Sequence, residues 1–552
     1  MRVRTLFACG MVLVGCRAAP PASPADSLDL VVAATTDVHG HLRGWDYYAE
    51  RPDTMRGLAR AATIVDSVRR SASLPPILVD AGDMLEGNPL TFVAARIDTM
   101  QLHPVIAAMN AMHYDAAVIG NHEFNYGMGL LERASGQADF PLLAANAFTP
   151  AGAPRFRGWT MVRRGPLRVA LIGATTPGSM LWDRDNLAGR LVIRDIVPSV
   201  RTAVEGARTA GADVVVVLLH SGLDEPSSYD TVSTHVPSEN VAARVAREVP
   251  GIDLIVYGHS HAQMADTLIG STLLMQPKNW ATSVAVAHID VVRRDGRWAV
   301  AGKRSAIITS VHHRESRAVL SATERGHRAA MRYANTPIGT TTVAWRADSA
   351  RVVDTPLIDF ILEVERRASG AQLASTAAFS LDASIAAGLI PLARIAALYP
   401  YDNTLRAVRI SGRQLREYLE WSARYFRAAP DGSYAVDRAI PGYNFDVVSG
   451  VDYTIDVSRP VGARITKLQY QGRDVAPADT FTMALNNYRQ SGGGGYAMLR
   501  SAPVVYDRQQ EIRQLLIDEV RRAGTLRPTD YFHPNWRIEP AAAIGPLLHS
   551  MR

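Results

Sequence analysis

The sequence predicts an α/β fold in two domains, and three observations support this prediction. In the first half of the chain, short Val- and Ile-rich runs alternate with amphipathic stretches of helical period, which is typical of buried, largely parallel strands joined by helices. From about Thr267 the pattern changes to strands of alternating polarity, and from about Thr340 to a mixture of helices and strands. The composition, with 47% apolar and 20% charged residues, is that of a globular protein that can bury a sizeable core.

The N-terminal segment is predicted to export and anchor the chain. Arg2 and Arg4 precede an apolar run, 6–14, that is too short to span a bilayer but suits the core of a signal peptide. The following Leu-Val-Gly-Cys quartet resembles a bacterial lipobox, which implies cleavage before Cys16, its acylation, and a lipoprotein of the periplasm or cell surface. Residues 16–28, rich in Pro, Ala and Ser, would form a tether. Residues 1–15 would be the signal peptide that is removed. The alternatives are a plain secretory signal or an uncleaved anchor.

The charge pattern argues against a stable nucleic-acid partner. The chain has 59 basic and 53 acidic residues and a net charge of +6, and no block or stripe of Lys and Arg accompanies this small excess. The only two cysteines, Cys9 and Cys16, lie near the N-terminus, so no disulfide can staple the body of the chain. The sequence leaves the oligomeric state open.

Five apolar runs of the first region end abruptly in polar side chains that can bind metals. The residues at these five ends are, in chain order, Asp37 and His39; Asp83; Asn121 and His122; His220; and His259 and His261. Ligands of α/β sheets gather outside the carboxyl ends of the strands, so we expect these residues on one edge of one sheet. A single Asp or His at a strand end is more often a helix cap or a satisfied hydrogen-bonding residue, but five such ends together indicate a metal centre.

The chemistry of this set narrows the metal. With His122 set aside, two carboxylates, four imidazoles and one amide supply oxygen and nitrogen donors without sulfur. Such a set suits Mn, Zn, Fe or Co rather than a thiolate-built structural site.

The order of these motifs resembles the calcineurin-like metallophosphoesterases. With the second region included, the chain after the tether looks like the two-domain family of bacterial 5′-nucleotidases and 2′,3′-cyclic-nucleotide 2′-phosphodiesterase/3′-nucleotidases. The resemblance implies a metallophosphoesterase sandwich over 29–335, a hinge over 336–345 and a mixed α/β nucleoside-binding domain over 346–540.

Carried over by motif, the resemblance implies two divalent metal ions that share Asp83. Around one ion it places Asp37, His39, Asp83 and His261, and around the other Asp83, Asn121, His220 and His259. His261 stands where 5′-nucleotidases usually have Gln, which keeps a ligand atom but could change metal preference. Two such ions can lower the pKa of a water molecule and clamp a phosphoryl oxygen.

The resemblance and the chemistry also predict a catalytic pair, His122 and Asn125. His122 would protonate the leaving oxygen or stabilise the transition state, and the alternative is a hydrogen-bonding role in support of the metal ligands. Asn125 stands where many 5′-nucleotidases have Asp. An amide can orient the imidazole but cannot pair with its charge, which favours the cyclic-phosphodiesterase branch.

In the second region, Tyr401, Asn403 and Tyr488 match the family's nucleoside-binding elements. Tyr401 and Tyr488 would sandwich the base, and Asn403 would bond its edge. The alternative is that both tyrosines only pack. Two departures from the 5′-nucleotidase pattern argue against a 5′-monophosphate as the substrate. Asp382 stands where 5′-nucleotidases have an Arg that binds phosphate, and Gly494 stands where they have an Asp that binds the sugar.

The predicted function is hydrolysis of 2′,3′-cyclic nucleotides and 3′-nucleotides by an exported lipoprotein, for nucleotide salvage. Three alternatives stay open at this point. They are a 5′-nucleotidase or UDP-sugar hydrolase, a thiohydrolase of sulfur oxidation, and a surface protein that binds nucleotides without catalysis.

Overall fold

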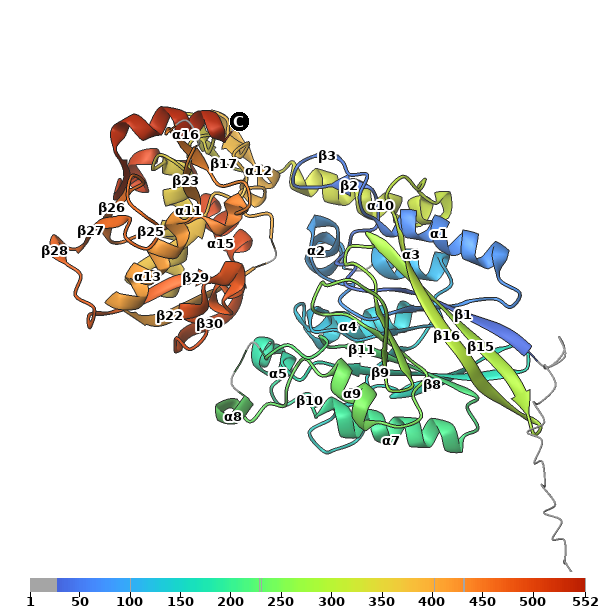
Figure 1. The fold of residues 1–552 in the computed structure, drawn as a ribbon. Helices are drawn as coiled ribbons and strands as arrows, with labels where there is room; N and C mark the ends of the chain where they lie inside the picture. Colours follow the sequence, from blue (N-terminus) through green and yellow to red (C-terminus); the bar gives the residue numbers. More distant parts are fainter. Residues whose placement is uncertain are drawn as a thin grey trace, which may run out of the picture.

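The protein is arranged in two lobes, shown in Figure 1. A computed structural model describes residues 27–99, 101–227, 229, 231–401, 403–429 and 432–551. The first lobe ends with helix α10 (Arg317–Ala334), and the second begins with strand β17 (Pro337–Thr341). The predicted signal peptide and Cys16 lie outside the described residues, so the lipid anchor stays a prediction. Among the described helices, none is long and apolar enough to cross a membrane.

Two six-stranded sheets form the framework of the first lobe. The first has the order β16 (Arg297–Thr309), β15 (Ser283–Arg294), β1 (Ser27–Thr35), β4 (Ile77–Asp80), β5 (Ala116–Val118) and β6 (Leu142–Leu143). The second has the order β13 (Met264–Ile269), β14 (Thr272–Gln276), β12 (Leu254–Tyr257), β11 (Val214–His220), β9 (Leu167–Thr175) and β8 (Trp159–Arg164). The central strands pair in parallel and the β15–β16 hairpin antiparallel, as the sequence predicts.

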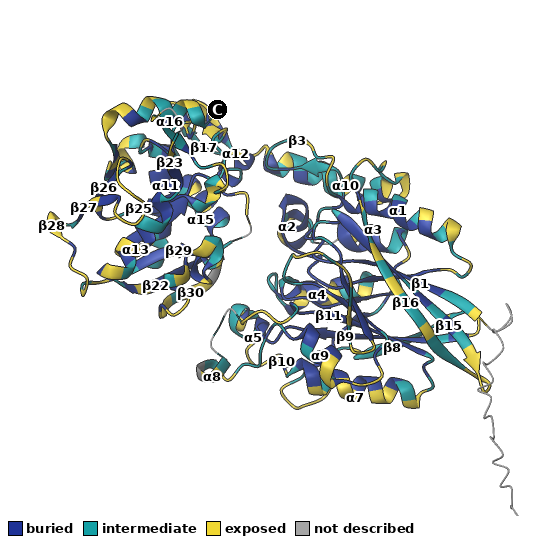
Figure 2. Ribbon diagram, viewed as in Figure 1, coloured by how far each residue is buried: buried dark blue, intermediate teal, exposed yellow. Residues whose placement is uncertain are grey.

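The sheets pack face to face, and alternate residues of each strand serve different layers. Leu30 and Val32 of β1 share a buried cluster with Val216 of β11, which lies between the sheets. Val31, between them in sequence, points the other way and packs with helix α1 (Leu58–Ser71). On the outer face of the second sheet, helices α7 (Ile196–Thr209) and α9 (Ala242–Glu248) cover the opposite set of residues. The lobe is therefore a helix–sheet–sheet–helix sandwich, and Figure 2 shows its central strands buried and the β15–β16 hairpin partly exposed.

The expectation that all five polar strand ends share one sheet is wrong. Strands β1, β4 and β5 belong to the first sheet, whereas β11 and β12 belong to the second. The buried runs are alike in composition, so their pattern cannot show where the chain leaves one sheet and starts another. Both sheets nevertheless present their carboxyl ends at the same end of the sandwich, because side chains from the two sets touch there.

The second lobe is built on a mixed five-stranded sheet. Its order is β25 (Asp446–Ser449), β19 (Leu373–Ala377), β29 (Thr480–Asn486), β22 (Thr404–Ser411) and β30 (Val504–Glu511). Local sequence sets the limits of its helices. Helix α11 (Pro356–Ser369) begins with a proline and ends at Gly370 in the left-handed conformation, and α13 (Gly412–Ala423) begins with a capping box between Ser411 and Gln414. These elements share one buried apolar core.

A short crossing and a few polar contacts join the lobes. Helix α10 packs on α2 (Pro89–Arg96) and α3 (Pro104–Ala111) of the first lobe, whereas β17 pairs with β21 (Gly388–Pro391) and β31 (Thr525–Leu526) of the second. The predicted linker 336–345 thus contains a paired strand, and its role as a hinge stays a prediction. Across the gap, Arg513 donates to the Tyr48 hydroxyl at 3.0 Å, and Arg394 pairs with Glu50 at 3.2 Å.

Candidate metal centre and nucleoside pocket

The loops that follow the polar strand ends are unusual in their backbone. Asp37, His39, Asp83, His259 and His261 all have positive φ angles, between 45° and 74°. Residues with side chains seldom adopt this conformation, which costs free energy and persists only where surrounding contacts fix it. Here backbone bonds between the first two loops fix it, because Asp37 N donates to Gly82 O at 2.8 Å and His39 N to Asp83 O at 3.0 Å. Such strain is typical of a functional site.

The loops bring the predicted ligands into two adjoining clusters. In one, the ligand atoms of Asp37, His39 and His261 lie within 4.8 Å of one another, and in the other those of Asp83, His220 and His259 do. The Asp83 carboxylate lies between the clusters. Its Oδ2 is 3.0 Å from His220 Nε2 and 3.9 Å from His39 Nε2. Asn121 turns its Oδ1 to within 3.0 Å of His220 Nε2, on the side of the second cluster.

The donor set fits a pair of cations. His39 Nε2 and His261 Nε2 face each other at 3.1 Å, and His261 Nε2 is 3.4 Å from Asp37 Oδ1. The outer nitrogens of two of these rings donate to backbone carbonyls: His39 Nδ1 to Glu86 O at 3.1 Å and His220 Nδ1 to Ala81 O at 2.8 Å. These bonds fix the proton on Nδ1 and turn the Nε2 lone pair inward, which is the tautomer that a metal needs.

The pKa values of residues within the clusters also fit the binding of cations. Burial would raise the pKa of Asp37, but the neighbouring His261 and His220 lower it to about 2. Burial lowers the pKa of His259 to about 3, so this imidazole is neutral. For His220, the Asp83 carboxylate outweighs burial and raises the pKa to about 9, so a metal ion that binds there must displace a proton.

His122 lies beside the clusters on a short 3₁₀ turn, His122–Phe124, directly after β5. Its backbone N–H donates to Asp83 Oδ1 at 2.8 Å, and its Nδ1 is 2.6 Å from Asn125 Oδ1. Burial would lower the pKa of His122, but the Asp83 and Glu86 carboxylates outweigh it and raise the pKa well above its ordinary value. These two carboxylates favour the protonated imidazole, which is the form that a general acid needs.

Two carboxylates at this end of the sandwich were missed by sequence reasoning. Glu123 accepts backbone N–H bonds from the loop of Asp83, at 2.8, 2.7 and 3.0 Å, and one from Gly120 at 2.7 Å. Glu86 Oε2 lies 3.1 Å from His122 Nδ1. Glu123 follows His122 directly in the sequence, so its place in that motif was a signal, whereas nothing in the sequence marks Glu86.

The predicted base-binding tyrosines lie in the second lobe. Tyr401 and Tyr488 are 38% and 44% exposed, which is enough to offer a ring face to a ligand. Tyr443, which sequence reasoning missed, is similarly exposed and meets Tyr401 with ring centroids 6.3 Å apart. The backbone carbonyl of Asn403 accepts a bond from Ile512 N at 3.1 Å, and the bond of its side chain to a base edge stays a prediction.

A buried arginine next to these tyrosines joins the loops that carry them. Arg489 is 2% exposed and forms a bidentate pair with Asp446, at 2.8 and 2.7 Å. It also donates to the carbonyls of Tyr443 at 2.9 Å and Gly493 at 2.7 Å, and to Asn444 Oδ1 at 3.3 Å. One guanidinium thus fixes the Tyr443 turn, the glycine run and, through the adjacent residue, Tyr488.

The two departures from the 5′-nucleotidase pattern have a structural setting. Gly494 has a φ of 70°, and a Cβ built there would lie 2.3 Å from both Arg489 and Asn444. The position therefore has no room for the acidic side chain of 5′-nucleotidases. Asp382 lies at the surface, where its backbone N–H donates to Ser380 Oγ.

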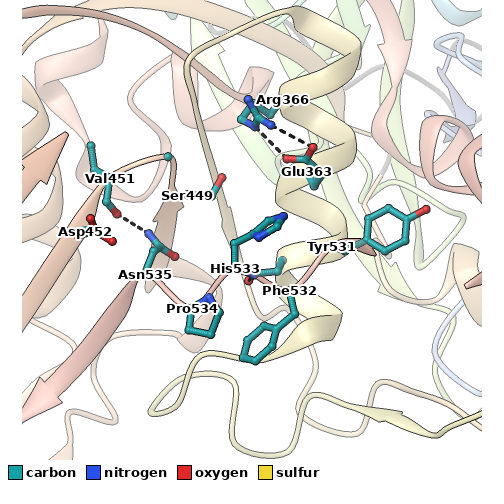
Figure 3. Close-up of a pocket in the computed structure, with 12 residues that line it drawn as sticks. Glu363, Arg366, Ser449, Val451, Asp452, Tyr531, Phe532, His533, Pro534 and Asn535 are labelled. Atoms are coloured by element: carbon teal, nitrogen blue, oxygen red, sulfur yellow. Dashed lines mark hydrogen bonds and ion pairs between the residues drawn. The ribbon is translucent and has the colours of Figure 1, made fainter. Parts of the chain in front are cut away.

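A separate hollow of about 500 Å³ lies in the second lobe, between α11 and the segments 449–452 and 531–535. Figure 3 shows Arg366 paired with Glu363, and Asn535 bonded to the carbonyl of Val451. None of the predicted site residues lines it. This hollow is therefore distinct from the metal centre and from the tyrosines.

Comparisons with known proteins cover both lobes. Residues 30–263 match the calcineurin-like phosphoesterase model, and residues 337–501 match the model of the 5′-nucleotidase C-terminal domain. The 2′,3′-cyclic-nucleotide 2′-phosphodiesterase/3′-nucleotidase of Haemophilus influenzae is 30% identical over 93% of this chain and 88% of its own. The trifunctional nucleotide phosphoesterase YfkN of Bacillus subtilis is 30% identical over 95% of this chain. YfkN is longer, and the match covers 40% of its length.

A solved structure is similar over both lobes. It is a Staphylococcus aureus protein described as a 5′-nucleotidase, with a TM-score of 0.68 and 26% identity, and the match covers 92% of this chain and 99% of the other.

Proposed function

Because the chain belongs to the two-domain family of metal-dependent phosphoric ester hydrolases that contains the bacterial 2′,3′-cyclic-nucleotide 2′-phosphodiesterase/3′-nucleotidases, we propose that it hydrolyses 2′,3′-cyclic nucleotides and 3′-nucleotides. The observation that supports hydrolysis most directly is the convergence of two donor clusters from two sheets beside His122. The relatives' names support the choice of substrate.

Two divalent ions held by these clusters would activate water and stabilise negative charge on the phosphoryl group. We propose Asp37, His39, Asp83 and His261 as the ligands of one ion, and Asp83, Asn121, His220 and His259 as those of the other. Nitrogen and oxygen donors without sulfur support Mn, Zn, Co or Fe.

The protein side chains supply the remaining steps. His122 gives its proton to the leaving oxygen, while Nδ1 stays bonded to Asn125. Tyr401 and Tyr488 stack on the base, and the two lobes together hold a substrate that reaches from the metals to the tyrosines. The crowded Gly494 and the absence of an arginine at position 382 support selection against 5′-monophosphates.

A substrate panel on metal-loaded protein tests this proposal. At equal concentration, we expect a higher kcat/KM for 2′,3′-cyclic AMP and 3′-AMP than for 5′-AMP. A preference for 5′-AMP would instead support the alternative that the protein is a 5′-nucleotidase. The similar Staphylococcus aureus structure is described as a 5′-nucleotidase. No hydrolysis of any nucleotide by fully metal-loaded protein would contradict both.

The location of the enzyme is part of the proposal. The lipobox-like quartet supports export and acylation of Cys16, followed by nucleotide salvage at the periplasm or cell surface. We expect the Cys16→Ser variant to lose both fatty-acid labelling and membrane fractionation. Unchanged labelling would remove the anchor from the proposal.

A further inference from the structure

We propose that Asp183 is a positioning residue for His122, which acts by locking the side-chain amide of Asn125 in one orientation. The proposal rests on the role proposed above for His122 as the group that protonates the leaving oxygen. It adds a residue that lies 58 positions further along the chain than Asn125, on a different element.

The hydrogen bonds of the Asn125 side chain allow only one orientation of its amide. Asn125 turns its Oδ1 to His122 Nδ1 at 2.6 Å and donates with its Nδ2 to both oxygens of Asp183, at 3.0 and 3.1 Å. An ionised carboxylate can only accept hydrogen bonds. A flipped amide would set its carbonyl oxygen against the carboxylate and its N–H₂ group against the ring nitrogen, so it would lose these bonds and gain a repulsion.

The orientation of the amide decides the state of the imidazole. With Oδ1 facing it, His122 Nδ1 must carry a hydrogen, and the exchangeable proton is then at Nε2, the nitrogen on the side of Asp83. Asp183 therefore supplies, one amide away, the carboxylate that a direct His–Asp pair would have. Asn125 transmits its orienting effect without bringing its charge into contact with the ring.

Asp183 is itself held firmly. It lies at the junction of two short helices, α5 (Ser179–Trp182) and α6 (Arg184–Leu187), and is 6% exposed. Asn186 donates to Asp183 Oδ1 at 3.3 Å and to the backbone carbonyl of Phe124 at 3.0 Å. The junction is thus tied to the turn that carries His122, which keeps the carboxylate and the amide in register.

Glu86 limits the expected size of the effect. Its Oε2 lies 3.1 Å from His122 Nδ1, and its negative charge favours a hydrogen on the same nitrogen. Loss of Asp183 therefore weakens a preference that Glu86 partly maintains. A general acid contributes roughly 10²- to 10⁴-fold, and we expect the Asp183→Asn variant to lose about 10- to 100-fold of this.

The first test uses Asp183→Asn, because an amide at this position can donate as well as accept and so lets Asn125 flip. We expect kcat for 2′,3′-cyclic AMP and for an alkyl phosphate diester to fall, with KM, metal content and Tm unchanged. Hydrolysis of bis-nitrophenyl phosphate should change little, because its leaving group needs no proton. Asp185→Asn, an exposed neighbour on α6, is the matched control and should equal the wild type.

The second test exchanges the two side chains. Asn125→Asp alone places two carboxylates about 3 Å apart, which should lower kcat because like charges repel. Adding Asp183→Asn restores one carboxylate and one amide in reversed order, so the double variant should be more active than Asn125→Asp. Additive losses in the double variant would overturn the proposal.

Other outcomes are equally decisive. If Asp183→Asn slows good and poor leaving groups alike and lowers the Tm, the residue supports folding alone and the proposal is wrong. If the wild type hydrolyses no nucleotide, the proposed function fails, but the comparison of alkyl and nitrophenyl diesters still tests Asp183.

Discussion

The metal centre and the exposed tyrosines of the second lobe hold their side chains in opposite ways. In the metal centre, most of the proposed ligands are buried and five of the seven sit on strained backbone that loop contacts enforce. In the second lobe, the tyrosines that would touch a base are more than a third exposed, and the residue that is fixed is Arg489 beneath them. One site is thus set before any ligand arrives, whereas the other offers a contact surface. Single substitutions should therefore cost far more in the first than in the second.

The largest effect should follow removal of the metals. Because the chemistry depends on ions held between the two clusters, chelation should reduce nucleotide hydrolysis to background, and Mn, Co or Zn should restore it. Asp83→Asn should come close to this result, since one carboxylate serves both clusters. Elemental analysis and kcat measured together check both. Full turnover by verified metal-free protein would contradict the proposal that the chemistry depends on metal ions.

His122→Ala should be the next most damaging change. We expect kcat to fall roughly 10²- to 10⁴-fold for substrates with poor leaving groups, with near-normal metal content, because the loss is that of a general acid. Assays with an alkyl and a nitrophenyl ester measure the difference. An equal loss on both would mean that His122 positions the substrate rather than protonating it.

A smaller effect on kcat/KM is expected at the exposed tyrosines of the second lobe. Tyr488→Ala should remove roughly 1 to 3 kcal/mol of stacking, or about 5- to 150-fold in kcat/KM for nucleotides. Bis-nitrophenyl phosphate has no base to stack, so its hydrolysis should change little. If the hydrolysis of both substrates slows equally, Tyr488 has a packing role and does not bind the base.

Much of this arrangement could be predicted from the sequence, because strand ends in α/β sheets are marked by apolar runs that stop at polar residues. Asp37, Asp83 and His220 stand at such ends, and the structure brings them together. The pattern could not show that these ends belong to two sheets, since buried strands of either sheet read alike.

The residues that sequence reasoning missed share a physical cause. Glu86 lies near His122, and Asp183 bonds to Asn125, through contacts between loops that are far apart in the chain. Arg489 likewise bonds to Asp446 and Asn444 and to the backbone carbonyls of two separate loops. Such roles leave no local pattern of spacing or period. The positive φ angles of the ligand loops were hidden for the same reason, because contacts with neighbouring loops impose them against local preference.

Two buried carboxylates, one in each lobe, differ in their electrostatic surroundings, and this difference gives the last prediction. In the metal centre, imidazoles lower the pKa of Asp37 to about 2. In the second lobe, burial first and then the charge of Asp354 raise the pKa of Asp359 to about 7. Asp359 is 4% exposed, and its Oδ2 accepts a bond from His533 N at 2.9 Å. Without a cationic partner in the same environment, the folded protein keeps this carboxyl protonated where the unfolded chain does not.

The sign of the effect follows from this difference in proton binding. The stability that protonated Asp359 contributes is complete below pH 4, declines as the pH rises toward 7, and is lost above it, because only the folded state binds the proton in that window. Asp359→Asn keeps an acceptor for His533 and a donor for Asp354 without a charge. Relative to the wild type, this variant should therefore gain a few degrees in Tm at pH 8 compared with pH 5, since one pKa unit corresponds to about 1.4 kcal/mol. Asp452→Asn, at the exposed rim of the same hollow, is the matched control. A constant difference in Tm between Asp359→Asn and the wild type across this range would show that Asp359 binds its proton no more tightly in the folded protein than in the unfolded chain, and would contradict the prediction.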